Sequence, residues 1–452
     1  MKIVIDGAGE VGCHLAKMLA GENNEITIID QDAEQLRKVA QSCDVITCLG
    51  NPSSIDTLKE AGVAKCDLFI AVNPSDSQDV NIVSAVLAKK LGAQRTTARI
   101  NNQEYLSFEY KNIFTELGID LLFYPEKIAA TEITDMLRRT TSTDSLDFAR
   151  GKLQMAVFRL EEESNLVDRQ LGEVVAEIST EDIQFRVVAI ARDNETLIPR
   201  VDTRFRCNDL VFIISKREGI NVLMDYVGKR SVEVKKLMIL GGSPIGEMVA
   251  TAMCKDLEEV KIIDSNRAKC EALSESLPRN VTVVYGDGRS TDFLIEEGIK
   301  DFDAFVAVTP DTETNILSCV AAKKLGMSRT IAQIENIEYI RIAEGMGVDA
   351  AINKKLITAG RIFKFTLNNK VRLVKYMSGT DAEVIEFIVA PDSKITKGKI
   401  KDIGFPEKAI IGGVIRGSDA FIAIGDTEIK AYDRVAVFAL PEVIKEVDKF
   451  FK

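Results

Sequence analysis

The stretch KIVIDGAGEVG, residues 2–12, decides the fold of this chain. A short apolar run rich in β-branched residues meets the pattern G-x-G-x-x-G at Gly7, and an amphipathic segment follows and ends at Gly21. We therefore expect a buried parallel strand, a tight glycine-rich turn and a helix, in that order. The next strand-like run, EITIID, ends in Asp30, 23 residues after Gly7. An acid in this position satisfies the context that a dinucleotide-binding fingerprint requires.

The opening stretch returns, altered, in the second half of the chain. KLMILGGSPIG at 236–246 repeats it at an offset of 234 residues, and VAAKKLGMSRTIAQIENIEYI at 320–340 repeats VLAKKLGAQRTTARINNQEYL at 86–106. Each copy alternates strand-like and helix-like segments. A duplication this long predicts an α/β fold with two Rossmann-like domains, each a doubly wound parallel sheet.

A shorter repeat follows each of these domains. Residues 188–213 resemble 413–438, and an offset of 224 aligns Arg192 with Arg416 and Asp209 with Asp433. Short alternating strands, turns and a helix-like segment predict a small α+β domain of about 80 residues in each case. Polar stretches at 140–145 and 228–236 suggest boundaries. The chain is therefore expected to divide into a Rossmann-like domain at 1–140, a small α+β domain at 141–229, a second Rossmann-like domain at 230–366 and a second small domain at 367–452.

Composition limits the functions that the chain can have. It has 452 residues, of which 46% are hydrophobic and 28% charged, and a formal net charge of -11. The negative charge argues against general nucleic-acid binding, which needs a basic surface. No apolar run approaches the roughly 18 residues that a spanning helix needs. The eight cysteines form no CxxC pair, so we expect small buried side chains in a reducing, cytoplasmic protein.

The first glycine-rich turn has the residues that a pyrophosphate needs. Gly7 permits a tight turn, and Gly9 has no Cβ to block the close approach of the phosphates. The amides near Glu10 and Val11 would then point at the phosphates, with the helix dipole behind them. Asp30 would accept hydrogen bonds from ribose hydroxyls and repel a 2′-phosphate, which favours NAD(H) over NADP(H). A ligand-free structural turn, with Glu10 only a first-turn acid, is the alternative.

The strand pattern adds three residues to the candidate site. Asn73 and Pro74 follow the fourth predicted strand, on the rim where open α/β sheets bind ligands. Arg99 lies near the end of the fifth strand, and a positive charge in an apolar run indicates an anion such as a phosphate. An ion pair with an acid at a domain contact is the alternative for Arg99.

The second copy lacks several of these features. Ser243 replaces the second glycine and places a Cβ where a pyrophosphate would approach, and Pro244 removes an amide donor. Gln333 stands where the first copy has an arginine, so a positive charge is lost, although Asp264 keeps the ribose carboxylate position. We expect this copy to bind a nucleotide more weakly, to bind a different one, or to be purely structural.

Neither an enzyme nor a DNA-binding repressor fits these residues. His14, the one histidine, falls near the first turn of the phosphate-binding helix, where a surface or packing role is expected. No tyrosine has a lysine four residues later, and there is no P-loop, so we expect no catalytic activity. A soluble redox-sensing repressor would need a basic helix-turn-helix, which the sequence does not supply.

The chain also resembles a known family. GAGEVG at 7–12, the acid that ends the second strand, AVNPSDSQDVNIVSAVLAKKLGAQRTTARI at 71–100 and the duplicated large–small order closely resemble the Trk-type potassium-uptake regulatory subunits, the TrkA family. The resemblance covers essentially the whole chain. It implies two regulator-of-potassium-conductance (RCK) units, a cytoplasmic location at the inner face of the membrane, docking on a TrkH-like potassium-transporting protein, and a homo-oligomeric ring, typically a tetramer. It also implies NAD(H) in the first copy, with NAD(H), ATP or ADP as the candidates for the second.

The family's nucleotide contacts can be carried over residue by residue. One departure is Asn51, where an aspartate often follows the glycine that ends strand three, and the second copy has Asp287 there. In the first copy the contacts fall on Gly7, Ala8, Gly9, Glu10, Val11, Asp30, Asn73, Pro74 and Arg99. In the second copy they fall on Gly241, Gly242, Ser243, Pro244, Ile245, Asp264, Thr309 and Gln333.

Overall fold

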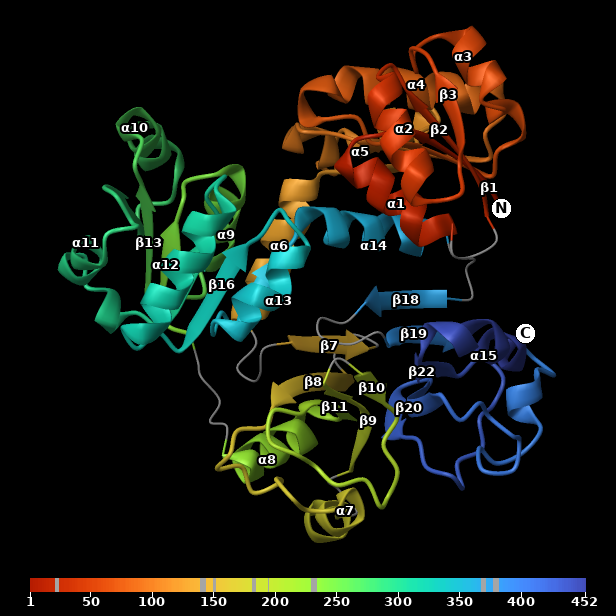
Figure 1. Ribbon diagram of the computed structural model, residues 1–452, viewed down its shortest axis with the longest axis vertical. Coiled ribbons are helices and arrows are strands. Elements are labelled where there is room, and N and C mark those ends of the chain that lie inside the picture. The colour runs from red at the N-terminus through yellow and green to blue at the C-terminus, as the bar shows by residue number, and fades with distance from the viewer. Residues whose placement is uncertain are drawn as a thin grey trace.

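Two large domains occupy the upper part of the molecule in Figure 1, and two smaller β-sheet domains lie below them. In the described part of the chain, no helix is both long and apolar enough to cross a membrane. The expected domain boundaries fall at or beside residues outside that part, so they stay predictions. The computed structural model describes residues 1–20, 24–138, 144–148, 152–180, 184–193, 195–228, 234–366, 371–376 and 382–452.

The first large domain is a six-stranded parallel sheet with helices on both faces. Its strands are β1 (Lys2–Asp6), β2 (Glu25–Asp30), β3 (Ile46–Leu49), β4 (Leu68–Ala71), β5 (Arg95–Arg99) and β6 (Leu121–Phe123). Its helices are α1 (Glu10–Ala20), α2 (Ala33–Ser42), α3 (Ile55–Glu60), α4 (Gln78–Leu91), α5 (Lys111–Glu116) and α6 (Pro125–Arg138). The strand order is β3-β2-β1-β4-β5-β6, with every pair parallel. Because the order reverses between β1 and β4, a ligand crevice is expected at their carboxyl ends.

The second large domain repeats this topology and confirms the expected pair of Rossmann-like folds. Its parallel strands run in the order β14-β13-β12-β15-β16-β17. These strands are β12 (Lys236–Leu240), β13 (Glu259–Asp264), β14 (Val281–Tyr285), β15 (Ala304–Ala307), β16 (Arg329–Gln333) and β17 (Ala350–Ile352). The helices are α9 (Pro244–Met253), α10 (Arg267–Ser276), α11 (Thr291–Glu296), α12 (Thr312–Lys324), α13 (Glu338–Gly345) and α14 (Lys354–Thr366).

Each small domain is an antiparallel sheet with one or two helices, as the α+β prediction requires. The strand orders are β10-β9-β11-β8-β7 and β18-β19-β22-β20-β21. The first comprises β7 (Asp144–Phe148), β8 (Leu153–Arg159), α7 (Leu171–Ile178), β9 (Phe185–Arg192), β10 (Glu195–Leu197), β11 (Leu210–Ser215) and α8 (Arg217–Val227). The second comprises β18 (Val371–Tyr376), β19 (Glu383–Ile388), β20 (Ala409–Arg416), β21 (Asp419–Ile422), β22 (Arg434–Ala439) and α15 (Ile444–Phe451).

The aligned arginine and aspartate of the small domains form an ion pair with a buried aspartate in both copies. Arg192 donates to both carboxylate oxygens of Asp209, each at 2.7 Å. Arg416 binds Asp433 in the same two-pronged way, with Nε and Nη2 at 2.9 and 2.7 Å from the two carboxylate oxygens. Both aspartates also accept a backbone amide three residues earlier, so each pair fixes the turn that leads into a central strand.

The two large domains exchange helices. α6 follows the first domain but packs on α9 of the second, and α14 follows the second domain but packs on α1 of the first (Figure 1). The Arg95 guanidinium donates to the carbonyl of Phe365 at 2.5 Å, and Arg329 donates to that of Met136 at 2.6 Å. These arginines are 234 residues apart. Each binds a carbonyl in the last turn of a helix from the other half, α14 for Arg95 and α6 for Arg329. Apolar residues of α14 therefore join the core of the first large domain, where α14 lies against α1, and those of α6 join the core of the second.

Candidate functional site

Two glycines of the first glycine-rich turn differ in their surroundings: Gly9 faces open space, and Gly12 packs against the backbone of Gly7. Gly7 has a φ of +110°, a backbone conformation that favours glycine. A Cβ added at Gly12 would lie 1.9 Å from the carbonyl oxygen of Gly7, so this glycine is required for the helix to meet the turn. A Cβ added at Gly9 would meet none of the described atoms within 4 Å. Packing does not require a glycine there, which agrees with a position kept free for a ligand.

Asp30 holds the turn from the end of β2. Its carboxylate accepts the amide of Ala8 at 2.6 Å and the amide of Asp32 at 2.8 Å. Each carboxylate oxygen can accept a further hydrogen bond, and the side chain is only half-buried, so a ribose hydroxyl could still bind there. Asp30, the residue predicted to bind the ribose, therefore also positions the backbone amides that would face the phosphates.

A buried carboxylic acid lies directly beneath the turn, and the sequence reasoning did not single it out. Asp6 ends β1 and accepts hydrogen bonds from Asn73 Nδ2 at 2.7 Å and Ser84 Oγ at 2.6 Å. Asn81 binds the backbone amide of Asn73 and donates to the carbonyl of Arg99. The predicted residues Asn73 and Arg99 are thus tied to β1 through one buried network. Pro74, next to Asn73, is exposed at its edge.

Burial makes Asp6 a group that titrates near neutral pH. Desolvation raises its pKa from 3.8 to about 7, the hydrogen bonds from Ser84 and Asn73 oppose the shift, and Asp30 adds to it. The folded protein therefore keeps this proton at pH values where the unfolded chain has lost it. Each unit of pH between about 4 and 7 then removes roughly 1.4 kcal/mol of stability, with no further loss above about 7.

We expect Asp6→Asn to remove this pH dependence. Since the amide cannot ionise, the variant should gain stability relative to the parent as the pH rises from 5 to 7, and the difference should then level off. The measurement is the thermal midpoint of both proteins across that range in matched buffers. The second copy has Leu240 at the equivalent position, so this position does not repeat the effect in the second turn. A constant difference between the two proteins at every pH would show that Asp6 is ionised throughout.

Arg99 lies at the end of β5 without an acidic partner among the described residues. Its side chain is half-buried, and its Nε is shielded from solvent with no hydrogen-bond partner in that part of the chain. A shielded guanidinium nitrogen is costly unless it meets an acceptor. This favours the phosphate interpretation of Arg99 over the ion-pair alternative.

Glu10 and His14 both face the second half of the protein. Glu10 forms an ion pair with Lys355, the second residue of α14. His14 Nε2 is buried and has no hydrogen-bond partner among the described residues. Burial, then Lys17 and Lys355, lower the pKa of His14. The histidine therefore packs at the domain contact, as expected, and Glu10 is more than a first-turn acid of its own helix.

Contacts within the protein hold the second turn, and Ser243 stands where the first turn has Gly9. Ser243 caps α9 by accepting the amide of Gly246 at 3.3 Å. A Cβ at Gly242 would lie 2.4 Å from a methyl of Leu273. Asp264 accepts the amide of Gly242 at 2.8 Å and also binds Lys269 at 3.0 Å. Burial alone would raise the pKa of Asp264, but the amide of Asn266, the Lys269 ammonium and the amide of Gly242 together lower it.

Thr309 and Gln333, the predicted site residues at the ends of β15 and β16, lie in a network like that of Asn73 and Arg99 but without a counterpart of Asp6. Asn315 accepts the amide and the hydroxyl of Thr309 at 2.9 and 2.7 Å, and donates to the carbonyl of Gln333 at 2.9 Å. Gln333 is 5% exposed, and its Oε1 has no partner among the described residues. Its amide nitrogen donates to Glu335 at 3.0 Å. A neutral amide thus occupies the place of the arginine, and Ile245 is buried in the core behind the turn.

The residues that follow β3 and β14, Asn51 and Asp287, form contacts only within their own turns among the described residues. The Asn51 side chain accepts the amide of Ser53 at 2.9 Å, whereas Asp287 pairs with Arg289 at 2.9 Å. Each side chain serves its own turn, so neither points to a nucleotide contact at this position.

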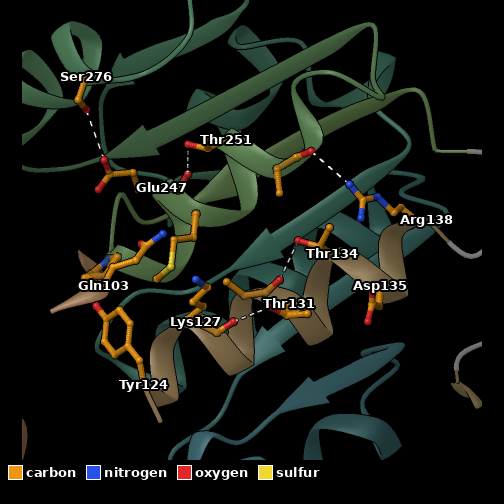
Figure 2. Close-up of a pocket in the computed structure, with 14 residues that line it drawn as sticks. Gln103, Tyr124, Lys127, Thr131, Thr134, Asp135, Arg138, Glu247, Thr251 and Ser276 are labelled. Atoms are coloured by element: carbon orange, nitrogen blue, oxygen red, sulfur yellow. Dashed lines mark hydrogen bonds between the residues drawn. The ribbon is translucent and has the colours of Figure 1, made fainter. Parts of the chain in front are cut away.

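A cavity of about 780 Å³ lies next to the second turn rather than in it. Figure 2 shows α6 along one side of it, with Lys127, Thr131 and Arg138, and Glu247 and Thr251 of α9 on the other. Of the predicted site residues only Pro244 lines it. The cavity marks the contact between the large domains and does not bring the candidate nucleotide residues together.

Two domain families match the chain. The TrkA-N domain matches residues 3–125 and 237–354, and the TrkA-C domain matches 155–228 and 384–452. The alternation of these matches agrees with the large, small, large, small order. The matches leave the residues that bind a ligand unassigned.

Relatives and solved structures extend the likeness over the full length. A Trk system potassium uptake protein TrkA homolog of Archaeoglobus fulgidus is 34% identical over 454 residues, which is 100% of each chain. The Trk system potassium uptake protein TrkA of Halomonas elongata is 33% identical and covers 100% of this chain and 99% of its own. The structure of the GsuK channel bound to NAD has a TM-score of 0.59 at 16% identity, over 100% of this chain and 78% of that one. GsuK bound to ADP has a TM-score of 0.50 at 14% identity, over 80% and 68%. At these identities the channel structures show a shared fold.

Proposed function

Since this chain belongs to the TrkA family of potassium-uptake proteins, we propose that it is the nucleotide-sensing regulatory subunit of a Trk-type potassium uptake system. It carries RCK units in tandem and is a non-enzymatic component of potassium transport. In this role it is cytoplasmic, sits at the inner face of the membrane on a TrkH-like transporting protein, and assembles as a homotetrameric ring. It does not act on nucleic acid.

The first glycine-rich turn is the observation that carries the proposal. Within the described part of the chain, a Cβ at Gly9 would meet no atom within 4 Å, and the shielded Nε of Arg99 has no acceptor. Asp30 and Arg99 then suit NAD(H), through a ribose and a phosphate. The related GsuK channel, whose structures contain NAD in one case and ADP in another, supports a nucleotide at this fold.

The second site is proposed to take NAD(H), ATP or ADP only weakly, or to serve as a structural counterpart. Ser243 and Gln333 remove the open space and the charge, and Lys269 already neutralises Asp264. A nucleotide bound in the first site would favour one arrangement of the large domains, and the ring would pass that change to the pore. The shift is limited by the difference in nucleotide affinity between the arrangements.

Asp30 should set the choice of cofactor. We expect the parent to bind NADH in preference to NADPH, because the carboxylate repels a 2′-phosphate. Asp30→Asn keeps an acceptor for the Ala8 amide but loses the charge, so NADH binding should weaken about tenfold and the preference should narrow. Fluorescence titration of both cofactors measures this. Equal affinity of the parent for NADPH and NADH would refute the role given to this carboxylate.

Arg99→Gln tests the link from nucleotide to transport. Loss of a charge-assisted bond should weaken NADH binding by roughly 1–3 kcal/mol, and Gln333→Arg should strengthen nucleotide binding by the second half. In cells that lack their own copy, Arg99→Gln should also blunt the nucleotide response of potassium uptake, with expression and membrane recruitment unchanged. A normal nucleotide response in this variant, or a parent that co-purifies with no membrane protein, would contradict the proposed function.

A further inference from the structure

One lysine of the second half reaches the nucleotide turn of the first. Lys355 lies near the N-terminus of α14 and pairs with Glu10, the first residue of α1. Its Nζ also donates to the carbonyl of Glu335 at 2.9 Å. The side chain is 13% exposed, so the ammonium is held in place rather than free in solvent. The lysine is therefore built into the contact where α14 crosses α1.

The position is unfavourable for a cation unless an anion lies beside it. The N-terminus of α1 carries a partial positive charge and free amides, which repel an ammonium and attract an anion. Glu10 supplies a negative charge, but its own side chain is 77% exposed and can move. An ammonium has three donors: among the described residues one donates to Glu10 and one to the Glu335 carbonyl, and the Glu335 carboxylate lies 4.0 Å from the nitrogen. One donor of Lys355 stays available at a helix end that already favours phosphate.

The equivalent position at the second turn has the opposite charge. In each half, a helix begins two residues after the last parallel strand: α6 follows β6, and α14 follows β17. The second residue of α14 is Lys355, and the second residue of α6 is Glu126. Burial, then Glu126 and Glu247, raise the pKa of Tyr124, and Arg99 opposes the shift. Figure 2 shows Tyr124 and Glu247 beside the same cavity. The second residue of the helix is thus a lysine beside the first turn and a glutamate, paired with Lys354 at 3.6 Å, beside the second.

We propose that Lys355 is a phosphate ligand of the first nucleotide site, donated by the helix that follows the second large domain. The proposal rests on the proposed function and names a residue of that same site. A dinucleotide held by the first turn would then contact both halves of the chain. Its affinity would depend on how α14 lies against α1, which is one of the contacts between the two halves.

A purely structural ion pair between Lys355 and Glu10 makes the opposite prediction, and paired variants separate the two. As a phosphate ligand, Lys355→Met should weaken NADH binding by the full chain roughly 10- to 100-fold, and Lys355→Arg should restore most of it. Glu10→Gln should tighten NADH binding a few-fold, because it removes a competing negative charge. Binding of adenosine, which has no phosphate, should be unchanged in Lys355→Met.

Lys354 provides a matched control. It pairs with Glu126 and Glu335 at 3.6 and 3.2 Å, and no pair joins it to Glu10. Lys354→Met should therefore leave NADH affinity within about twofold of the parent. Equal losses in Lys355→Met and Glu10→Gln, or a loss that extends to adenosine, would assign Lys355 a structural role and overturn the inference. A parent that binds no nucleotide would instead refute the proposed function itself.

Discussion

Replacing Gly9 by valine is expected to abolish NADH binding at the first site while the protein stays folded. A Cβ at Gly9 would have none of the described atoms within 4 Å, and Gly9 has no left-handed backbone conformation that favours glycine, so we expect a branched side chain to be accommodated. A ligand pyrophosphate would occupy that same space. We expect at least a roughly 100-fold loss of affinity, with the thermal midpoint close to that of the parent. Calorimetric titration with NADH and a circular dichroism melt measure the two quantities.

Gly12→Ala is the control for this variant. Its Cβ would lie 1.9 Å from the Gly7 carbonyl oxygen, so the helix or the turn must shift. We expect it to lower the thermal midpoint as well as the affinity, whereas Gly9→Val lowers the affinity alone. Gly9→Ser copies the natural second turn, where Ser243 stands, and should have an intermediate affinity. A folded Gly9→Val protein that binds NADH as the parent does would leave the turn without a ligand role.

Local patterns were sufficient to predict both large folds. The strand–glycine–helix order around Gly7 and Gly241 depends on side chains that are near one another in the sequence. The duplication shows the same order twice, which supports the prediction. The parallel sheets and the antiparallel small sheets confirm the expected fold. The nucleotide contacts themselves stay predictions, which the variants above are designed to test.

Contacts between distant segments could not be predicted in the same way. The sequence predicted Glu10 as a nucleotide contact or, alternatively, a first-turn acid, because Lys355 lies 345 residues away in the chain and meets it only through the exchange of helices. Asp6 looked like a charge at the end of a strand, since nothing local shows that Asn73 and Ser84 enclose it. One signal was present in the sequence: the second copy has Leu240 where the first has Asp6, which indicates a buried position.

Arg192→Met is expected to destabilise the first small domain by about 3–5 kcal/mol, the cost of leaving a buried charge without its partner. Asp209 is 1% exposed, and Arg192 is its only cationic partner among the described residues. The repeat had aligned these two residues with Arg416 and Asp433 without showing that they touch. Guanidinium unfolding measures the loss, and hydrogen exchange of the β9 and β11 amides assigns it to this domain.

The double variant Arg192→Met/Asp209→Leu decides whether charge burial is the cause. If the cost comes from an uncompensated carboxylate, replacing both partners with apolar side chains should recover most of the lost stability. If the cost comes from the turn, the double variant should be as unstable as the single one, because the Arg206 amide loses its acceptor on Asp209 either way. The first result is expected, since a single neutral amide contributes only about 1 kcal/mol. An Arg192→Met protein within about 1 kcal/mol of the parent would contradict both accounts, because the ion pair would then add nothing to the stability of the domain.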